Sequence, residues 1–95
     1  MTTYRLIFLA DAKREWDKLE AKVRDQFARK LKERLESPRI PSARLSDMPD
    51  CYKIKLRAAG YRLVYRVDDG RIVVAVIAVG RRERNAVYKA AAGRI

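Results

Sequence analysis

Basic residues at every second position mark two neighbouring segments of this chain as a candidate site for phosphate chemistry. Lys53 and Lys55 alternate with apolar residues in the first segment, and Arg62 lies near the start of the second. Strict alternation is typical of β-strands that have one apolar and one polar face. Cations gathered on the polar face could hold a phosphate and stabilise the negative charge that develops on it.

The short loop between the two segments predicts how they pair. A turn at Ala58-Ala59, or over the wider residues 57–60, places Lys55 opposite Arg62 and Lys53 diagonal to Arg62. The same register aligns apolar residues in pairs: Leu56 with Tyr61, Ile54 with Leu63, and Tyr52 with Tyr65. Facing cations repel, so the arrangement favours binding of an anion. A solvated outer face explains the same alternation about equally well.

The residue types restrict the chemistry that such a site could perform. The sequence contains no histidine, which excludes a nuclease that uses imidazole as acid and base. A lysine crowded by positive charge titrates more easily to the neutral amine, so Lys53 or Lys55 could act as a base. Arg62 and Arg82 could stabilise the transition state when an RNA 2′-OH attacks the adjacent phosphate. Because the carboxylates form no metal-ligand pattern, we expect metal-independent chemistry and no cofactor.

A second basic group, Arg81-Arg82-Glu83-Arg84, precedes Tyr88 near the C-terminus. An exposed tyrosine beside cations could stack on an unpaired RNA base. Packing of Tyr88 between a terminal helix and the sheet is the alternative. The residues alone favour that second interpretation, because most aromatic side chains belong to a core.

The formal net charge of +11, from 23 Lys and Arg against 12 Asp and Glu, predicts a polyanionic partner. Charge alone does not distinguish RNA from DNA, an acidic protein or an anionic membrane surface. Cys51 is the only cysteine, so no intramolecular disulfide forms, and a reducing cytoplasm suits the chain. The longest apolar stretch, residues 72–79, is too short to span a bilayer. We expect a single cytoplasmic domain over residues 1–95 with no membrane contact.

The elements that would position these groups form an α+β pattern. Residues 4–9 predict a strand, after which Asp11 offers a helix cap. Apolar residues then recur every three or four positions from Trp16 to Leu35, which predicts an amphipathic helical region ending before Pro38. One long helix, or two antiparallel helices that separate around residues 20–22, both fit this region.

The second half of the chain predicts a β-meander and a short helix. A loop over residues 39–50 precedes the two alternating strands, and Asp68-Asp69-Gly70 forms the next turn. The unbroken apolar run at 71–79 predicts a central strand covered on both faces, ended by Gly80. Alanine-rich residues 83–92 then predict a last helix before Gly93.

Several stretches of the chain resemble the RelE family of toxins. They are residues 36–40, residues 48–57 (Met-Pro-Asp-Cys-Tyr-Lys-Ile-Lys-Leu-Arg), residues 60–65 (Gly-Tyr-Arg-Leu-Val-Tyr), and Val79-Gly80 with the Arg82-Glu83-Arg84 and Val87-Tyr88 that follow. The likeness covers nearly the whole chain. It implies a small RelE-like fold, in which an N-terminal helical hairpin packs on one face of a mostly antiparallel sheet and a short helix ends the chain.

The resemblance also implies a role for each residue of the candidate site. Lys53 and Lys55 would activate the 2′-OH and hold the phosphate, and Arg62 would stabilise the developing charge. Arg82 would be the general acid for the leaving 5′-oxygen, and Tyr88 would stack on the nucleotide. The products would be a 2′,3′-cyclic phosphate and a 5′-hydroxyl. Further arginines would bind RNA: Arg44, Arg57, Arg81 and Arg84. The family's loop can carry one more arginine where this chain has Ser46, and Arg44 is a nearby substitute.

The function implied is that of a ribosome-dependent endoribonuclease that cleaves mRNA in the ribosomal A site and contacts 16S rRNA. A cognate RelB-like antitoxin would neutralise it, displace the C-terminal helix, and bind operator DNA only as the toxin-antitoxin complex. Two alternatives remain at this point. A ParE-like toxin would inhibit DNA gyrase without nuclease chemistry, and a plain nucleic-acid-binding module would use the cations only to neutralise phosphates.

Overall fold

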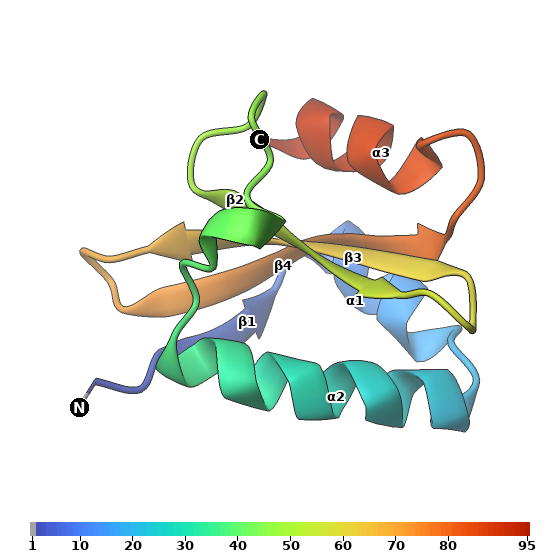
Figure 1. Cartoon of the computed structure of the whole chain (residues 1–95), viewed down its shortest axis with the longest axis horizontal. Coiled ribbons are helices and arrows are strands. Elements are labelled where there is room, and N and C mark those ends of the chain that lie inside the picture. Colours follow the sequence, from blue (N-terminus) through green and yellow to red (C-terminus); the bar gives the residue numbers. More distant parts are fainter. Residues whose placement is uncertain (1) are drawn as a thin grey trace.

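A four-stranded mixed sheet forms the centre of the computed structural model, which describes residues 2–95. The strands are β1 (Arg5–Phe8), β2 (Cys51–Leu56), β3 (Tyr61–Asp68) and β4 (Val73–Arg81), and their order across the sheet is β1-β4-β3-β2 (Figure 1). β1 runs parallel to β4, and the other neighbours are antiparallel. This arrangement confirms the mostly antiparallel sheet and the central position of the apolar strand.

The pairing of β2 with β3 has the predicted register. Lys55 lies opposite Arg62, and Lys53 lies opposite Val64 and therefore diagonal to Arg62. The turn takes the wider form, and Gly60 completes it at φ 73°, a left-handed conformation in which a Cβ is strained. Alternation and turn length together thus bring the basic side chains onto one face of the hairpin.

Two helices, α1 (Ala10–Asp17) and α2 (Ala21–Glu36), replace the long helix that the sequence left possible. The break falls at residues 18–20, where Glu20 has an extended backbone (φ −60°, ψ 147°) and Leu19 is buried in the core. No glycine or proline marks this break. The rings of Trp16 and Phe27, 6.4 Å apart, join the two helices. The prediction that Asp11 caps α1 is wrong, because Leu9 occupies the cap and Asp11 lies in the first turn.

Both faces of the sheet are covered. α1 and α2 lie on one side and enclose the larger apolar core, whereas α3 (Ala86–Arg94) crosses the other side (Figure 1). Under α3 lies a second apolar cluster that includes Cys51, Val64 and Val87. The face that carries Lys55 and Arg62 is therefore not a simple solvated surface: Arg62 is buried, whereas Lys53 and Lys55 stay partly exposed.

Two glycines were predicted to end an element, Gly80 a strand and Gly93 a helix, and neither does so. β4 begins at Val73 and continues through Gly80 to Arg81, because Gly80 pairs with Arg62 in the sheet. A Cβ on Gly80 would lie 3.4 Å from a methyl group of Val87, so this backbone lies directly under α3. α3 starts at Ala86, later than predicted, because Arg84 and Asn85 adopt left-handed conformations. It also continues past Gly93 rather than ending before it.

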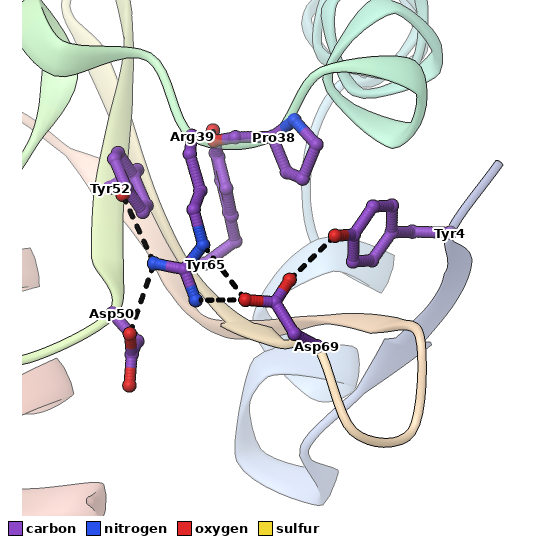
Figure 2. Close-up of polar contacts among 7 residues, drawn as sticks. All are labelled: Tyr4, Pro38, Arg39, Asp50, Tyr52, Tyr65 and Asp69. Carbon is purple, nitrogen blue, oxygen red and sulfur yellow. Dashed lines mark hydrogen bonds and ion pairs between the residues drawn. The ribbon is translucent and has the colours of Figure 1, made fainter. Parts of the chain in front are cut away.

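A polar network around Arg39 joins the chain's N-terminal segment to the turn between β3 and β4 (Figure 2). The Arg39 guanidinium donates to Asp69 at 2.8 and 3.1 Å, to Asp50 at 3.0 Å, and to the hydroxyl of Tyr52 at 3.3 Å. The hydroxyl of Tyr4 donates to the other oxygen of Asp69 at 2.5 Å. One arginine thereby connects four segments that lie far apart in the sequence.

We expect this network to make stability depend on pH through Asp69. The hydrogen bonds from Tyr4 and Arg39 hold the pKa of Asp69 below its ordinary value of 3.8. A depressed carboxyl pKa contributes stability that is fully present above the unfolded pKa and is lost as pH falls through the folded pKa. Asp69→Asn should therefore unfold at lower denaturant concentration than wild type near pH 7, and the two proteins should converge as pH falls through the folded pKa of Asp69, which lies below 3.8.

Denaturant unfolding followed by circular dichroism at several pH values measures this difference. Asp17→Asn is the control, because Asp17 forms only an exposed ion pair with Lys13 within α1, and such pairs contribute little. If Asp69→Asn differs from wild type by the same unfolding free energy at every pH, Asp69 is not the source of the pH dependence.

Within the part of the chain that the structure describes, no helix is both long enough and apolar enough to cross a membrane.

Candidate active site

A cleft of about 140 Å³ opens where the β2–β3 hairpin, the end of β4 and the start of α3 meet. Four residues of the predicted catalytic set line it: Lys55, Arg62, Arg82 and Tyr88. Arg81, predicted to bind RNA, lines it as well. Residues separated by more than thirty positions in the chain thus form one cationic site, because β2, β3 and β4 are neighbours in the sheet.

Arg62 is the most unusual residue of this cleft. Its side chain is only 6% exposed, and it is the one charged residue among the buried side chains that the structure describes. The guanidinium donates to the carbonyl of Tyr61 at 3.0 Å, and it takes part in none of the ion pairs found in residues 2–95. A buried cation without a counter-ion costs free energy. An anion bound at Arg62 would offset this cost.

Lys55 faces Arg62 across the hairpin. The positive charge of Lys53 is the largest cause that lowers the pKa of Lys55 from its ordinary value of 10.5, followed by desolvation and by the nearby arginines 57, 62 and 82. Each of these effects disfavours the ammonium form. Lys55 is therefore the group in the cleft that most readily supplies a neutral amine.

Lys53, which the sequence did not distinguish from Lys55 as a base, does not line the cleft. Its carbonyl accepts a hydrogen bond from Arg34 at 3.2 Å, and its ammonium acts on Lys55 through charge. The two-residue repeat puts both lysines on one face of the sheet. Only Lys55 lies where the end of β4 and the start of α3 form the cleft.

The structure confirms the packing of Tyr88, whereas its stacking on RNA stays a prediction. Tyr88 packs against the second apolar cluster, and it also lines the cleft. Its hydroxyl is buried and has no hydrogen-bond partner in the described residues. Unpaired buried hydroxyls are rare because they cost free energy.

The structure adds residues that the sequence analysis did not select. Glu83 and Asn85 line the cleft, and so do Ala86 and Val87 at the start of α3. The only signal for Glu83 was its position inside the basic run 81–84, where a single carboxylate among arginines stands out. A carboxylate at the rim can orient the neighbouring guanidinium groups toward a phosphate.

Three arginines predicted to bind RNA lie outside the cleft. Arg57 is exposed in the hairpin turn, close enough to lower the pKa of Lys55. Arg84 is exposed beyond β4. Arg44 forms an isolated backbone bridge with Tyr52 and is also exposed. Neither Arg44 nor Ser46 lines the cleft. No group of three or more His, Cys, Asp or Glu residues within 2–95 is arranged to hold a metal ion.

The sequence is similar to those of known toxins. The sequence model of the family described as "ParE toxin of type II toxin-antitoxin system, parDE" matches residues 6–86. The mRNA interferase toxin RelE of Escherichia coli strain K12 is 58% identical over 92 residues, which cover 97% of each chain. A putative RelE-like toxin protein of Escherichia coli is 52% identical over the same share of both chains.

The solved structures that the chain resembles are also RelE toxins. A doubly substituted E. coli toxin RelE in the free state matches with a TM-score of 0.92 and 54% identity, over 99% of both chains. The toxin in the intact E. coli RelBE toxin-antitoxin complex matches with a TM-score of 0.82 and 58% identity, over 85% of this chain and 99% of that one. The arrangement of helices and strands around the cleft is therefore shared with these toxins.

Proposed function

Because this chain belongs to the RelE/ParE superfamily of toxins from type II toxin-antitoxin systems, we propose that it is an mRNA interferase, an endoribonuclease that cleaves mRNA in the ribosomal A site. The observation that carries this proposal is the buried, unpaired guanidinium of Arg62 opposite Lys55 in a cleft lined by two further arginines. That combination of an anion site and a basic amine suits in-line attack on a phosphodiester.

The proposed reaction uses the side chains of the cleft. The neutral amine of Lys55 takes the proton of the RNA 2′-OH, and the 2′-oxygen forms a bond to the adjacent phosphorus. Arg62 stabilises the charge that gathers on the phosphoryl oxygens. The bond from phosphorus to the 5′-oxygen breaks, and Arg82 gives that oxygen a proton. The products are a 2′,3′-cyclic phosphate and a 5′-hydroxyl, while Tyr88 stacks on the nucleotide and fixes its orientation.

The family description names ParE, so gyrase inhibition remains the second candidate. Gyrase inhibition needs a binding surface but neither a base nor an anion site. A lysine with a lowered pKa that faces a buried arginine is better explained by catalysis. A plain RNA-binding module likewise has no need to bury an unpaired cation, since exposed lysines and arginines neutralise phosphates at lower cost.

We infer two kinds of partner for this activity. The first is an antitoxin similar to RelB, as in the E. coli RelBE complex to which the chain is similar. Binding of such an antitoxin over α3 would move Tyr88 and dismantle the cleft, and the complex would bind operator DNA. The second is the ribosome, since a net charge of +11 suits contact with 16S rRNA around the mRNA.

The test is a primer-extension map of a translated mRNA, with and without ribosomes, using wild type, Arg82→Ala and Arg29→Ala. Arg29 is exposed on α2, so its variant is a matched control that loses one positive charge away from the cleft. We expect cuts within the A-site codon that require ribosomes, that persist in Arg29→Ala, and that fall at least about 100-fold in Arg82→Ala.

Other outcomes reject the proposal in distinct ways. Cuts that appear without ribosomes would identify a free ribonuclease. If competent ribosomes yield no cuts at all, the function moves to gyrase inhibition or to plain binding. Equal, small and salt-dependent losses in both variants would indicate a binding module.

A further inference from the structure

The edge of β4 is only half covered by a neighbouring strand. β1 pairs with residues 73–76, whereas β4 continues to Arg81. Backbone groups on an uncovered edge need other partners. Two side chains supply them here: the N–H of Val79 donates to Glu15 at 3.2 Å, and Arg94 donates to the carbonyl of Ile77 at 2.8 Å.

Those two side chains also bind each other. The Arg94 guanidinium donates to both oxygens of the Glu15 carboxylate, at 2.8 and 2.9 Å. Glu15 belongs to α1 and Arg94 to the last turn of α3. The pair therefore passes around the edge of the sheet and connects helices that pack on opposite faces. Two-point arginine–carboxylate pairs fix geometry more strongly than a single contact.

The remaining anchors of α3 are mostly small side chains, with Tyr88 and Ala90 partly buried against the second apolar cluster. The buried residues of this helix are Val87 and Ala91, and Asn85 at its start makes no side-chain capping bond. The helix is nine residues long, too short to be stable by itself in water. Its position on the sheet therefore depends strongly on the contacts of Arg94, whose side chain is 20% exposed.

We propose that Glu15 and Arg94 are positioning residues for the cleft: their ion pair holds α3 against α1 and β4 so that Tyr88 faces the substrate. The role extends the proposed function, because it assumes that Tyr88 acts on RNA. Neither residue lines the cleft, so their effect passes through the placement of α3. A small displacement of a substrate-positioning group is enough to lower a catalytic rate.

The test compares Glu15→Gln with Arg94→Ala, because these variants change the net charge in opposite directions. A purely electrostatic role would strengthen RNA binding in the first and weaken it in the second. Positioning predicts that both lower kcat by about 10- to 100-fold with smaller changes in KM. Arg94→Lys should lie between Arg94→Ala and wild type, since an amine can still bind one carboxylate oxygen.

Lys13→Ala is the matched control. Lys13 precedes Glu15 by two residues on α1, and its ammonium binds Asp17 of the same helix, at 2.6 Å. This variant removes one cation and one ion pair without touching α3, and its kcat should stay within about twofold of wild type, as surface substitutions usually do.

A double-mutant cycle tests the path through Tyr88. In a Tyr88→Ala background, Glu15→Gln should cause little further loss, because the group that it positions is gone. Amide hydrogen exchange in residues 86–94 should also be faster in Arg94→Ala at unchanged global stability. Losses that multiply in the double variant, or single variants that cut like wild type, overturn the positioning role. A wild-type protein that cuts nothing on ribosomes instead overturns the proposed function.

Discussion

Arg62→Met is expected to abolish most cleavage while making the protein more stable. Methionine retains much of the length and apolar stem of the arginine but removes a cation that is 6% exposed and has no carboxylate partner in the described residues. Replacing buried charge with apolar groups of similar volume often stabilises a fold, here by about 1 kcal/mol. Loss of one preorganised donor to the transition state lowers the rate by about 100- to 1,000-fold.

The two effects are measured separately, by single-turnover cleavage on ribosomes and by denaturant unfolding without RNA. Arg66→Met is the matched control, because Arg66 lies on the same strand but is exposed. That substitution should change the unfolding free energy by less than about 0.5 kcal/mol and should leave most of the rate. If Arg62→Met proves both less stable and still active, Arg62 is a structural residue and the anion site is wrongly placed.

Cleavage should rise with pH through the titration of Lys55, and substitution of the neighbouring Lys53 should move that rise. The charge of Lys53 is the largest cause that lowers the pKa of Lys55. Lys53→Ala therefore raises the pKa of Lys55, which leaves less neutral amine at any pH below it. The break in the pH–rate profile should shift to higher pH. Lys55→Ala should remove the break and about 100- to 10,000-fold of the rate.

Single-turnover rates on programmed ribosomes, measured from about pH 6 up toward the ordinary lysine pKa of 10.5, give these profiles. Lys30→Ala, which removes an exposed lysine from α2, controls for the loss of a positive charge, and its profile should overlay that of wild type. A profile that Lys53→Ala leaves unshifted would show that Lys55 is not the base. A break that survives in Lys55→Ala would assign the titration to another group.

The pattern of alternation was enough to predict the hairpin that carries the site. Side chains in a strand alternate with a strict period of two, and a short turn allows few registers. The opposition of Lys55 and Arg62 followed directly, and the pairing confirms it. The apolar run before Gly80 predicted a central strand for the same reason, since only a strand buried on both faces consists of unbroken apolar residues.

Element boundaries were less predictable where long-range packing decides them. The break between α1 and α2 has no glycine or proline, and it arises because Leu19 turns into the core. Gly80 does not stop β4, since its backbone pairs with Arg62 of β3. In both places a tertiary contact overrides the local signal.

The sequence by itself determined which cations share one face of the sheet, because that follows from the two-residue repeat of a single hairpin. Only the tertiary structure decided that Arg62 is buried without a counter-ion, that Lys53 stays outside the cleft, and that α3 brings Tyr88 beside Arg82. It also decided that Glu15 meets Arg94, 79 residues away in the chain. Burial and contact between distant segments depend on how the layers pack, and no local repeat in a sequence encodes that packing.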